Sequence, residues 1–209
     1  MNREKQRTIE SYNKNGQKFA DKFTNYPTYQ KKIIEFCQTA INDGSSVLDL
    51  GCGPGNNASV IMQQKSNCTL VGYDLSETMI KIAQSTVPNC QFEIQDINDL
   101  KEEKQYDVVI ASFCIVHLNH TETETLISKI ANILPTGGSL FLSCMEGKKP
   151  GFETTSFSES EIWFNYYERG WLSDKLKKDC FEVISFSTEP YPEKNGIITT
   201  DMFFSAKKK

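Results

Sequence analysis

Three glycines at alternating positions follow a short apolar run in the stretch "VLDLGCGPGNN". Gly51, Gly53 and Gly55 lack a Cβ, so the backbone there can turn sharply and approach a ligand closely. About twenty residues further along the chain, Asp74 ends a second apolar run, where an acidic side chain can bind both hydroxyls of a ribose. The glycine loop and Asp74 together predict a binding site for an adenosine-type cofactor.

Two features of the loop discriminate between the cofactors that carry this ribose. A dinucleotide fingerprint has the spacing G-x-G-x-x-G, whereas this loop reads G-x-G-x-G and has Asn56 where the last glycine would be. Asp49, just ahead of the loop, would repel a pyrophosphate but suits a cation. The loop therefore favours S-adenosylmethionine, which carries an ammonium and a sulfonium, over the nicotinamide dinucleotide of an oxidoreductase.

Strands and helices that alternate along the chain would place the glycine loop and Asp74 at the ends of strands. Residues 3–42 are helical in pattern, with an interruption at Pro27, and short apolar runs then alternate with amphipathic segments. The pattern predicts strands at 46–51, 68–75, 90–96, 106–113 and 139–145, and helices at 56–64, 76–86 and 121–134. Ser76 would cap the second of these helices, and a capping box of Thr121 and Glu124 would open the third.

The end of the chain has a different pattern. Residues 146–160 resemble a loop, and residues 161–179 an aromatic-rich helix that Gly170 interrupts. Two further strands are predicted at 181–191 and 198–207. The turn residues "PEKNG" between them indicate a β-hairpin.

Strands rich in Val, Ile and Leu, each followed by a helix, indicate a parallel sheet that is covered on both faces. The sequence therefore predicts an α/β fold with a doubly wound, mostly parallel seven-stranded sheet, a C-terminal antiparallel β-hairpin and an N-terminal helical cap. No break in composition marks a domain boundary, so one domain over 1–209 is expected. Its parts are a helical cap (1–44), a cofactor-binding core (45–145), a substrate-side insertion and helix (146–180) and the hairpin (181–209).

Composition narrows the class of protein. A formal net charge of -4 and a pI near 5.3 provide no general attraction to nucleic acid or to anionic membranes. The seven cysteines are odd in number, widely spaced and without a CxxC pair, which argues against disulfides and a zinc site. The first ten residues have no apolar signal core. We expect a soluble cytoplasmic protein without a bound metal.

The stretch "VLDLGCGPG" closely resembles motif I of the class I S-adenosylmethionine-dependent methyltransferases. The stretches "VGYDLSETMIKIAQ", "FEIQDINDL", "YDVVIASFCIVHL" and "LPTGGSLFLS" resemble the motifs that follow in that family. The terminal hairpin resembles the antiparallel last strand that separates the family from dinucleotide-binding folds. This resemblance covers most of the chain and implies methyl transfer from S-adenosylmethionine, with S-adenosylhomocysteine as product.

The resemblance also implies roles for individual residues at the methionine end of the cofactor. Asp49 and the carbonyl of Gly51 would face the methionine ammonium, directly or through water. Gly53 and Gly55 would leave room for the cofactor, and Tyr12 would lie near the same end.

At the nucleoside end, the resemblance implies that Asp74 binds the ribose and that Leu75 packs on the adenine, with Met79 beside it. Asp96 would accept from the adenine amino group, and the backbone N–H of Ile97 would donate to a ring nitrogen. Structural alternatives stay open, because Asp96 could cap the turn that follows it, and Leu75 and Met79 could be ordinary core residues.

The fourth motif would lie at the reacting methyl group, with Ser112 or Phe113 passing under the sulfonium. Since the sulfonium already activates the methyl group, orientation and exclusion of water would supply most of the catalysis. His117 follows this motif and titrates near neutral pH, so it is a candidate general base or, alternatively, a packing residue. His120 is expected in an exposed loop.

The sequence contains fewer signals for the identity of the methyl acceptor than for the cofactor. The "PPY"-type motif of nucleic-acid amine methyltransferases is replaced here by "ASFC", and Cys114 lacks the preceding proline of a cytosine-C5 nucleophile. An acidic chain without a basic, aromatic patch favours a small-molecule acceptor over RNA or protein. A non-catalytic module that binds the cofactor and acts through a partner is the second hypothesis.

Two aromatic segments could shape an acceptor pocket or simply pack the cap onto the sheet. Arg169 in the second segment could pair with an anionic substrate, or only with Glu168 and solvent. The aromatic candidates are Tyr12, Phe19, Tyr26 and Tyr29 in the N-terminal helices, and Trp163, Tyr166, Tyr167 and Trp171 in "EIWFNYYERGW".

Overall fold

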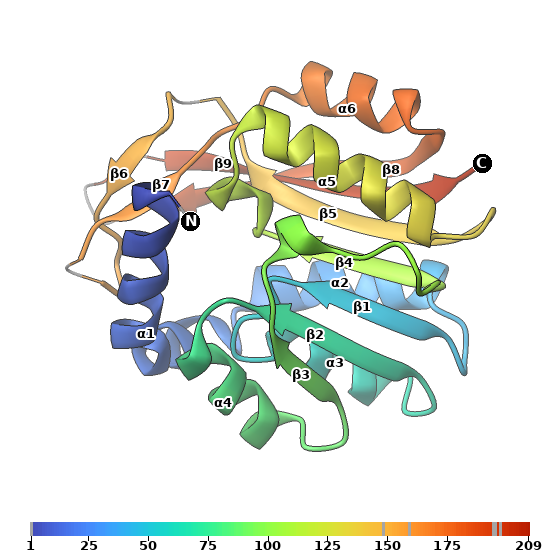
Figure 1. Ribbon diagram of the computed structural model, residues 1–209, viewed down its shortest axis with the longest axis horizontal. Helices are drawn as coiled ribbons and strands as arrows, with labels where there is room; N and C mark the ends of the chain where they lie inside the picture. The colour runs from blue at the N-terminus through green and yellow to red at the C-terminus, as the bar shows by residue number, and fades with distance from the viewer. Residues whose placement is uncertain (1, 148, 159, 194–195, 197) are drawn as a thin grey trace.

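Seven strands form one sheet in the order β3-β2-β1-β4-β5-β9-β8 (Figure 1). The computed structural model describes residues 2–147, 149–158, 160–193, 196 and 198–209. The strands of this sheet are β1 (Ser46–Leu50), β2 (Thr69–Asp74), β3 (Gln91–Ile94), β4 (Val108–Ser112), β5 (Ser139–Met145), β8 (Phe181–Pro192) and β9 (Ile198–Lys208). A separate two-stranded sheet pairs β6 (Gly151–Glu153) with β7 (Ile162–Phe164).

The strand order reverses between β1 and β4, which are parallel neighbours in the sheet. The chain runs outward from β1 through β2 to β3, returns to β4, and then continues in the other direction to β5. β9 joins β5 antiparallel, and β8 follows as the edge strand. The predicted doubly wound sheet with a terminal hairpin is confirmed, and its switch point is where such sheets bind ligands.

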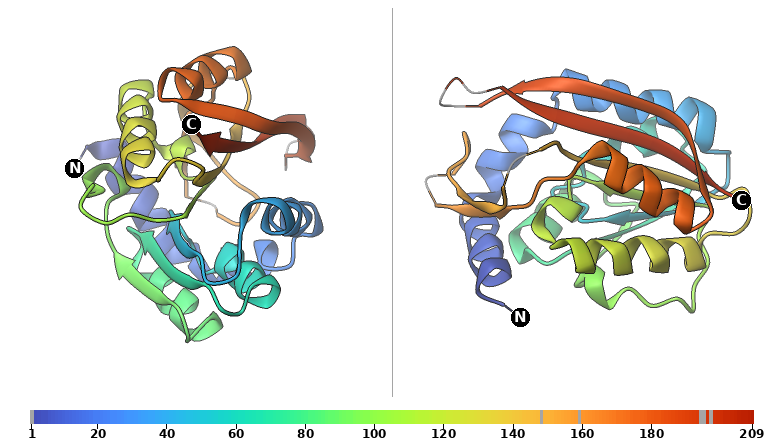
Figure 2. Two further views of the ribbon diagram at one scale, coloured as in Figure 1. Left: turned by 90° about the vertical axis from the view of Figure 1, so that its right-hand side faces the viewer. Right: turned by 90° about the horizontal axis from the view of Figure 1, so that it is seen from above.

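Helices cover both faces of the sheet, as Figure 2 shows, with α5 and α6 on one side and α2 and α3 on the other. Val47 and Leu48 of β1 are both fully buried but belong to different clusters of the core, because adjacent strand residues face opposite sides. The α-helices are α1 (Arg3–Phe23), α2 (Pro27–Ala40), α3 (Asn56–Gln64), α4 (Glu77–Thr86), α5 (His120–Ile133) and α6 (Arg169–Lys178), and two short 3-10 helices span Ile97–Asp99 and Ile115–His117.

Helix α1 stands across the open end of the sheet, beside β6 and β7 (Figure 1). Asn13 in α1 accepts a hydrogen bond from the Ser76 hydroxyl at 2.7 Å, and the same hydroxyl caps α4 as predicted. Gly16 of α1 lies so close to α4 that an added Cβ would stand 2.7 Å from the Thr78 methyl. This close approach holds the predicted helical cap over the carboxyl ends of the strands.

Three local predictions are wrong. The capping box of α5 is formed by Asn119 and Glu122 rather than by Thr121 and Glu124, because Asn119 offers a capping oxygen one residue before the helix begins. The segments expected as a loop (146–160) and as the start of a helix (161–179) contribute β6 and β7 instead.

The β6–β7 pair is stabilised by aromatic packing that has no helical period. The rings of Phe152 and Trp163 contact each other across the pair at 5.5 Å. The helix then begins only at Arg169, so Gly170 lies in its first turn and interrupts nothing. Within the described residues, every helix is too short or too polar to span a bilayer.

Candidate active site

A cavity of about 270 Å³ opens at the carboxyl ends of β1, β2 and β4, beneath α1 and the β6–β7 pair. Most residues that the sequence marked as site candidates contribute to its wall, whereas Asp49 and Gly55 do not. The wall includes Tyr12, Gly51, Gly53, Asp74, Leu75, Met79, Asp96, Ile97, Ser112, Phe113 and His117.

The three glycines of the loop all have positive φ angles, but a side chain at each of them would meet different surroundings. A Cβ on Gly51 (φ 66°) would stand 2.5 Å from the Cβ of Cys114, so the close approach of the segment after β4 excludes a side chain. Gly53 (φ 54°) lines the cavity and would have Phe19 at 3.9 Å. Gly55 (φ 85°) instead packs α3 against Ala83 of α4. Gly55 therefore serves helix packing, and the expectation that it leaves room for a cofactor is not supported by its position.

Asp74 connects the glycine loop to the start of α4. Its Oδ2 accepts from the Gly53 N–H at 3.0 Å, and its Oδ1 accepts from the Ser76 N–H at 2.8 Å. Burial raises the pKa of this carboxyl, while these backbone donors oppose the rise. Because each carboxylate oxygen has a second lone pair and the side chain lines the cavity, Asp74 can accept two further hydrogen bonds from a diol.

Asp49 lies behind the cavity wall, fully buried. No described donor meets the hydrogen-bond geometry at either carboxylate oxygen, although the Asn57 side chain lies close enough to affect the pKa of Asp49. Burial raises its pKa to about 7, Asp74 adds to the rise, and the side chain of Asn57 opposes it. A buried carboxylate without a well-aligned hydrogen bond is costly, so this group fits a site that a nearby cation completes.

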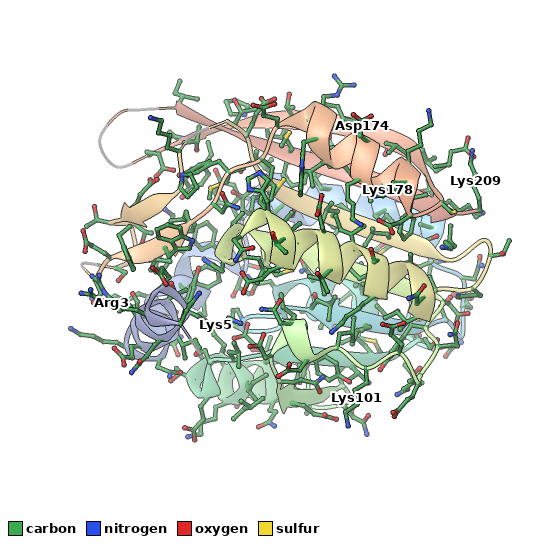
Figure 3. The ribbon with its side chains drawn as sticks, turned by 45° about the horizontal axis from the view of Figure 1, so that its top comes forward. Arg3, Lys5, Lys101, Asp174, Lys178 and Lys209 are labelled. Atoms are coloured by element: carbon green, nitrogen blue, oxygen red, sulfur yellow. The ribbon has the colours of Figure 1, made fainter. Side chains whose placement is uncertain are left out.

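Asp96 caps the turn that follows it, which is one of the two expected roles, and also lines the far end of the cavity; its role toward the adenine stays a prediction. Its Oδ1 accepts from the Asn98 N–H at 3.0 Å and caps the turn, whereas its Oδ2 pairs with Lys5 of α1 at 2.7 Å and lines the cavity. Figure 3 shows Lys5 on the first helix. Leu75 and Met79 line the same cavity, and Met79 also belongs to the buried core.

The residue after β4 has a backbone conformation that is rare for a side-chain-bearing residue. Phe113 has a φ of 52°, and its N–H donates both to the carbonyl and to the hydroxyl of Ser143. The Ser112 hydroxyl lies 3.0 Å from the same Ser143 hydroxyl. Such strain persists only where neighbours hold it, and here it directs the Phe113 ring toward Tyr29, at 5.0 Å.

His117 is engaged through both ring nitrogens. Its Nδ1 donates to the Trp163 carbonyl at 2.8 Å, because a carbonyl can only accept. Its Nε2 therefore accepts from the Tyr12 hydroxyl at 3.1 Å. Burial lowers the pKa of His117 to about 4 and raises the pKa of Tyr12. This neutral, hydrogen-bonded pair favours a positioning role over the general-base role, which stays a prediction.

The structure places only some of the aromatic candidates in the wall of the cavity. Tyr12, Phe19, Tyr29 and Tyr166 line the cavity, and Tyr26, Trp163, Tyr167 and Trp171 do not. The Arg169 guanidinium stacks over the Phe186 ring at 4.0 Å and does not line the cavity. His120 is exposed as expected, although it begins α5 and contacts the ring of Trp171. Cys114 is buried against the glycine loop, and burial raises its thiol pKa.

Sequence reasoning missed the acidic residues that line the rest of the cavity. Asp201 lies near the start of β9, and Glu153 ends β6. The Tyr29 hydroxyl donates to Asp201 at 2.7 Å, and the Tyr166 hydroxyl donates to Glu153 at 2.8 Å. Each acidic residue belongs to a strand that no cofactor motif includes, so only the packing of distant strands reveals them.

A family model described as a methyltransferase domain matches residues 47–138, from β1 to the turn before β5. The trans-aconitate 2-methyltransferase of an Escherichia coli strain is 35% identical over 127 residues, which cover 59% of this chain and 48% of that protein. The chain thus spans about half the length of this curated relative. The region that the family model matches contains the glycine loop and the cavity-lining residues from Gly51 to Leu118.

Two solved structures share the fold. The magnesium protoporphyrin IX methyltransferase of Synechocystis PCC 6803, with bound S-adenosylmethionine, is similar with a TM-score of 0.75 and 18% identity, over 100% of this chain and 99% of that one. The 1,6-didemethyltoxoflavin-N1-methyltransferase of Burkholderia thailandensis has a TM-score of 0.70 and 16% identity, over 96% and 85% of the two chains. At this identity the likeness concerns the fold alone.

Proposed function

We propose that the chain is a class I S-adenosylmethionine-dependent methyltransferase and that it transfers a methyl group from this cofactor to a small-molecule acceptor. The observation that carries the proposal is the convergence of the Gly53–Asp74 contact with the buried Asp49 carboxylate at the switch point of the sheet. The Asp74 carboxylate, held in place by Gly53, can accept hydrogen bonds from the two ribose hydroxyls. The negative charge of Asp49 would stabilise the cationic methionine group.

The residues around the cavity fit this cofactor, which supplies an activated methyl group when it is bound. Asp74 would hold the ribose, and Leu75 and Met79 would contact the adenine. The Asp49 carboxylate beneath the loop would compensate the positive charge of the methionine portion. Asp96 would share its carboxylate between Lys5 and the adenine amino group.

Orientation and exclusion of water would supply most of the catalysis. Orientation alone can lower a barrier by about 7 to 11 kcal/mol. Tyr12, Phe113 and Phe157 give the cavity an apolar wall, and the Tyr12–His117 hydrogen bond holds α1 over it. These residues would keep the acceptor in line with the methyl group and keep water away from it.

A small molecule is the acceptor that suits the covered cavity best. Helix α1 and the loop after β6 both contribute to its wall, through residues such as Phe23 and Phe157. The relatives compared above support this choice, because trans-aconitate and 1,6-didemethyltoxoflavin are small molecules.

Calorimetry and a transfer assay test the proposed function together. S-adenosylhomocysteine should bind to the purified protein, and NAD should not. Radiolabel from S-adenosylmethionine should then appear in the small-molecule fraction of a cell extract. Binding without transfer to any fraction would favour a non-catalytic cofactor-binding module, whereas label in RNA or protein would exclude the small-molecule acceptor.

A further inference from the structure

The cavity is acidic at the end away from Lys5. Three carboxylate side chains line this end, those of Glu153, Glu193 and Asp201. Among the described residues, Lys5 is the only lysine or arginine in the cavity wall, and it pairs with Asp96 at 2.7 Å. The end of the cavity beyond the cofactor residues is therefore lined by acidic side chains.

Asp201 is the most buried of these carboxylates, with an exposed fraction of 2%. Its Oδ2 accepts from the Tyr29 hydroxyl at 2.7 Å, and no described residue donates a hydrogen bond to its Oδ1. Burial raises its pKa to about 7, with Glu193 and Glu189 adding to the rise. Because Asp201 lines the cavity, its Oδ1 can accept a hydrogen bond from a ligand bound there.

Lys32, whose ammonium lies 5.5 Å from the centre of the Phe203 ring of β9, does not supply that donor. Lys32 pairs with Glu189 at 2.8 Å and donates to the Ser187 hydroxyl at 3.0 Å. It is therefore committed to β8 and does not line the cavity. Asp201 therefore has no ion pair among the described residues.

Aromatic rings surround this acidic end. Tyr29 contacts Phe113 with ring centroids 5.0 Å apart, and Tyr166 and Tyr191 also line the cavity. A cation is attracted both to a carboxylate and to the faces of such rings, whereas an anion is repelled by the carboxylates. A carboxylate among tyrosines is a typical receptor for an ammonium group.

We propose that the methyl acceptor is a small molecule bearing a protonated amine, and that Asp201 and Tyr29 receive its ammonium group. This inference rests on the proposed function, since it names the acceptor class for the same cavity. It separates the chain from its trans-aconitate relatives, whose acceptor is a polycarboxylate. The match covers only 48% of the trans-aconitate relative, so the residues that bind its acceptor can differ from those of this chain.

Binding measurements on protein saturated with S-adenosylhomocysteine test the proposal. The probes are 2-phenylethylamine, spermidine and agmatine as amines, and 3-phenylpropionate and trans-aconitate as anions. At least one amine should bind about tenfold or more tightly than either anion. Asp201→Asn should weaken that amine by about tenfold and leave the affinity for S-adenosylhomocysteine within about twofold.

Asp174→Asn is the matched control, because it makes the same change on the outer face of α6, away from α1 (Figure 3). It should leave amine binding unaltered. Tighter binding of an anion, or no binding of any amine, would overturn the proposal while leaving the cofactor site intact. Failure to bind S-adenosylhomocysteine would instead refute the proposed function. The comparison of amines with anions uses the unmodified protein and does not depend on a variant that folds.

Discussion

The Tyr12 hydroxyl lies 3.1 Å from Nε2 of His117, although 105 positions separate the two residues in the chain. The contact joins α1 to the helical turn after β4, and the Trp163 carbonyl of β7 accepts from the other ring nitrogen. Three segments that are distant in sequence therefore meet at one imidazole and close the cavity. Positioning of α1 is the role of His117 that this geometry supports.

His117→Ala should raise the KM for S-adenosylmethionine and leave the shape of the kcat pH profile unchanged between about pH 6 and pH 8. The pKa of His117 is lowered to about 4, so the ring does not titrate in this range. Loss of two hydrogen bonds predicts a rise of about 5- to 50-fold in KM. Tyr12→Phe removes one bond and should have a smaller effect. A limb near pH 6.5 that disappears in His117→Ala would instead identify the ring as a general base.

Asp49→Asn should stabilise the cofactor-free protein more at pH 8 than at pH 5. Its pKa rises from 3.8 to about 7 on folding, so its ionisation destabilises the fold progressively as pH rises between these values. The full shift corresponds to on the order of 4 kcal/mol above pH 7, reduced by the polarity of the buried amide. Thermal unfolding at both pH values measures this. An equal change in Tm at pH 5 and pH 8 would contradict it.

The same Asp49→Asn variant should bind S-adenosylhomocysteine more weakly, because the buried charge that would face the methionine ammonium is lost. In the unmodified protein, binding of the cationic group favours the ionised carboxylate. Affinity should therefore fall as pH decreases below about 7, and this slope should be flatter in the variant. Calorimetry from pH 6 to pH 8 checks both expectations, and parallel slopes would place Asp49 outside the cofactor site.

Asp74→Ala should weaken S-adenosylhomocysteine binding by about 10- to 100-fold, because a charge-assisted acceptor is lost. The substitution also releases the Gly53 and Ser76 N–H groups that hold the loop. Asp99→Ala is a suitable control, since Asp99 is exposed, close in space to the nucleoside end and outside the cavity wall. Equal affinities of the two variants in calorimetry would remove Asp74 from the site.

The sequence could predict most of the residues on the glycine-loop side of the cavity because their signals are local. The glycine loop follows β1 and Asp74 ends β2, the apolar run of each strand is visible in the chain, and parallel strand ends meet at one edge of the sheet. The acceptor half has no such signal. Asp201 reaches the cavity only because β9 inserts beside β5, a pairing between segments far apart in sequence. The cap of α5 was misplaced because Asn119 and Thr121 both precede a glutamate by three positions.

Gly51→Ala should destabilise the protein by about 2 to 5 kcal/mol. A Cβ would meet the Cβ of Cys114 at 2.5 Å, and the positive φ adds a cost of its own. Gly44→Ala is the matched control, because Gly44 has a φ of 81° and nothing within 4 Å of an added Cβ. It should cost only about 1 to 2 kcal/mol.

A double-mutant cycle separates the two costs at Gly51. Cys114→Gly removes the atom in the way, so Gly51→Ala made in that background should cost about as much as Gly44→Ala. Urea unfolding of the four proteins in the cycle measures the coupling. If Gly51→Ala and Gly44→Ala cost the same in the unmodified background, the loop does not depend on close contact with Cys114. A smaller cost of Gly51→Ala in the Cys114→Gly background is the expected result. It would show that Cys114 acts by packing against the glycine loop, which is the role its buried position indicates.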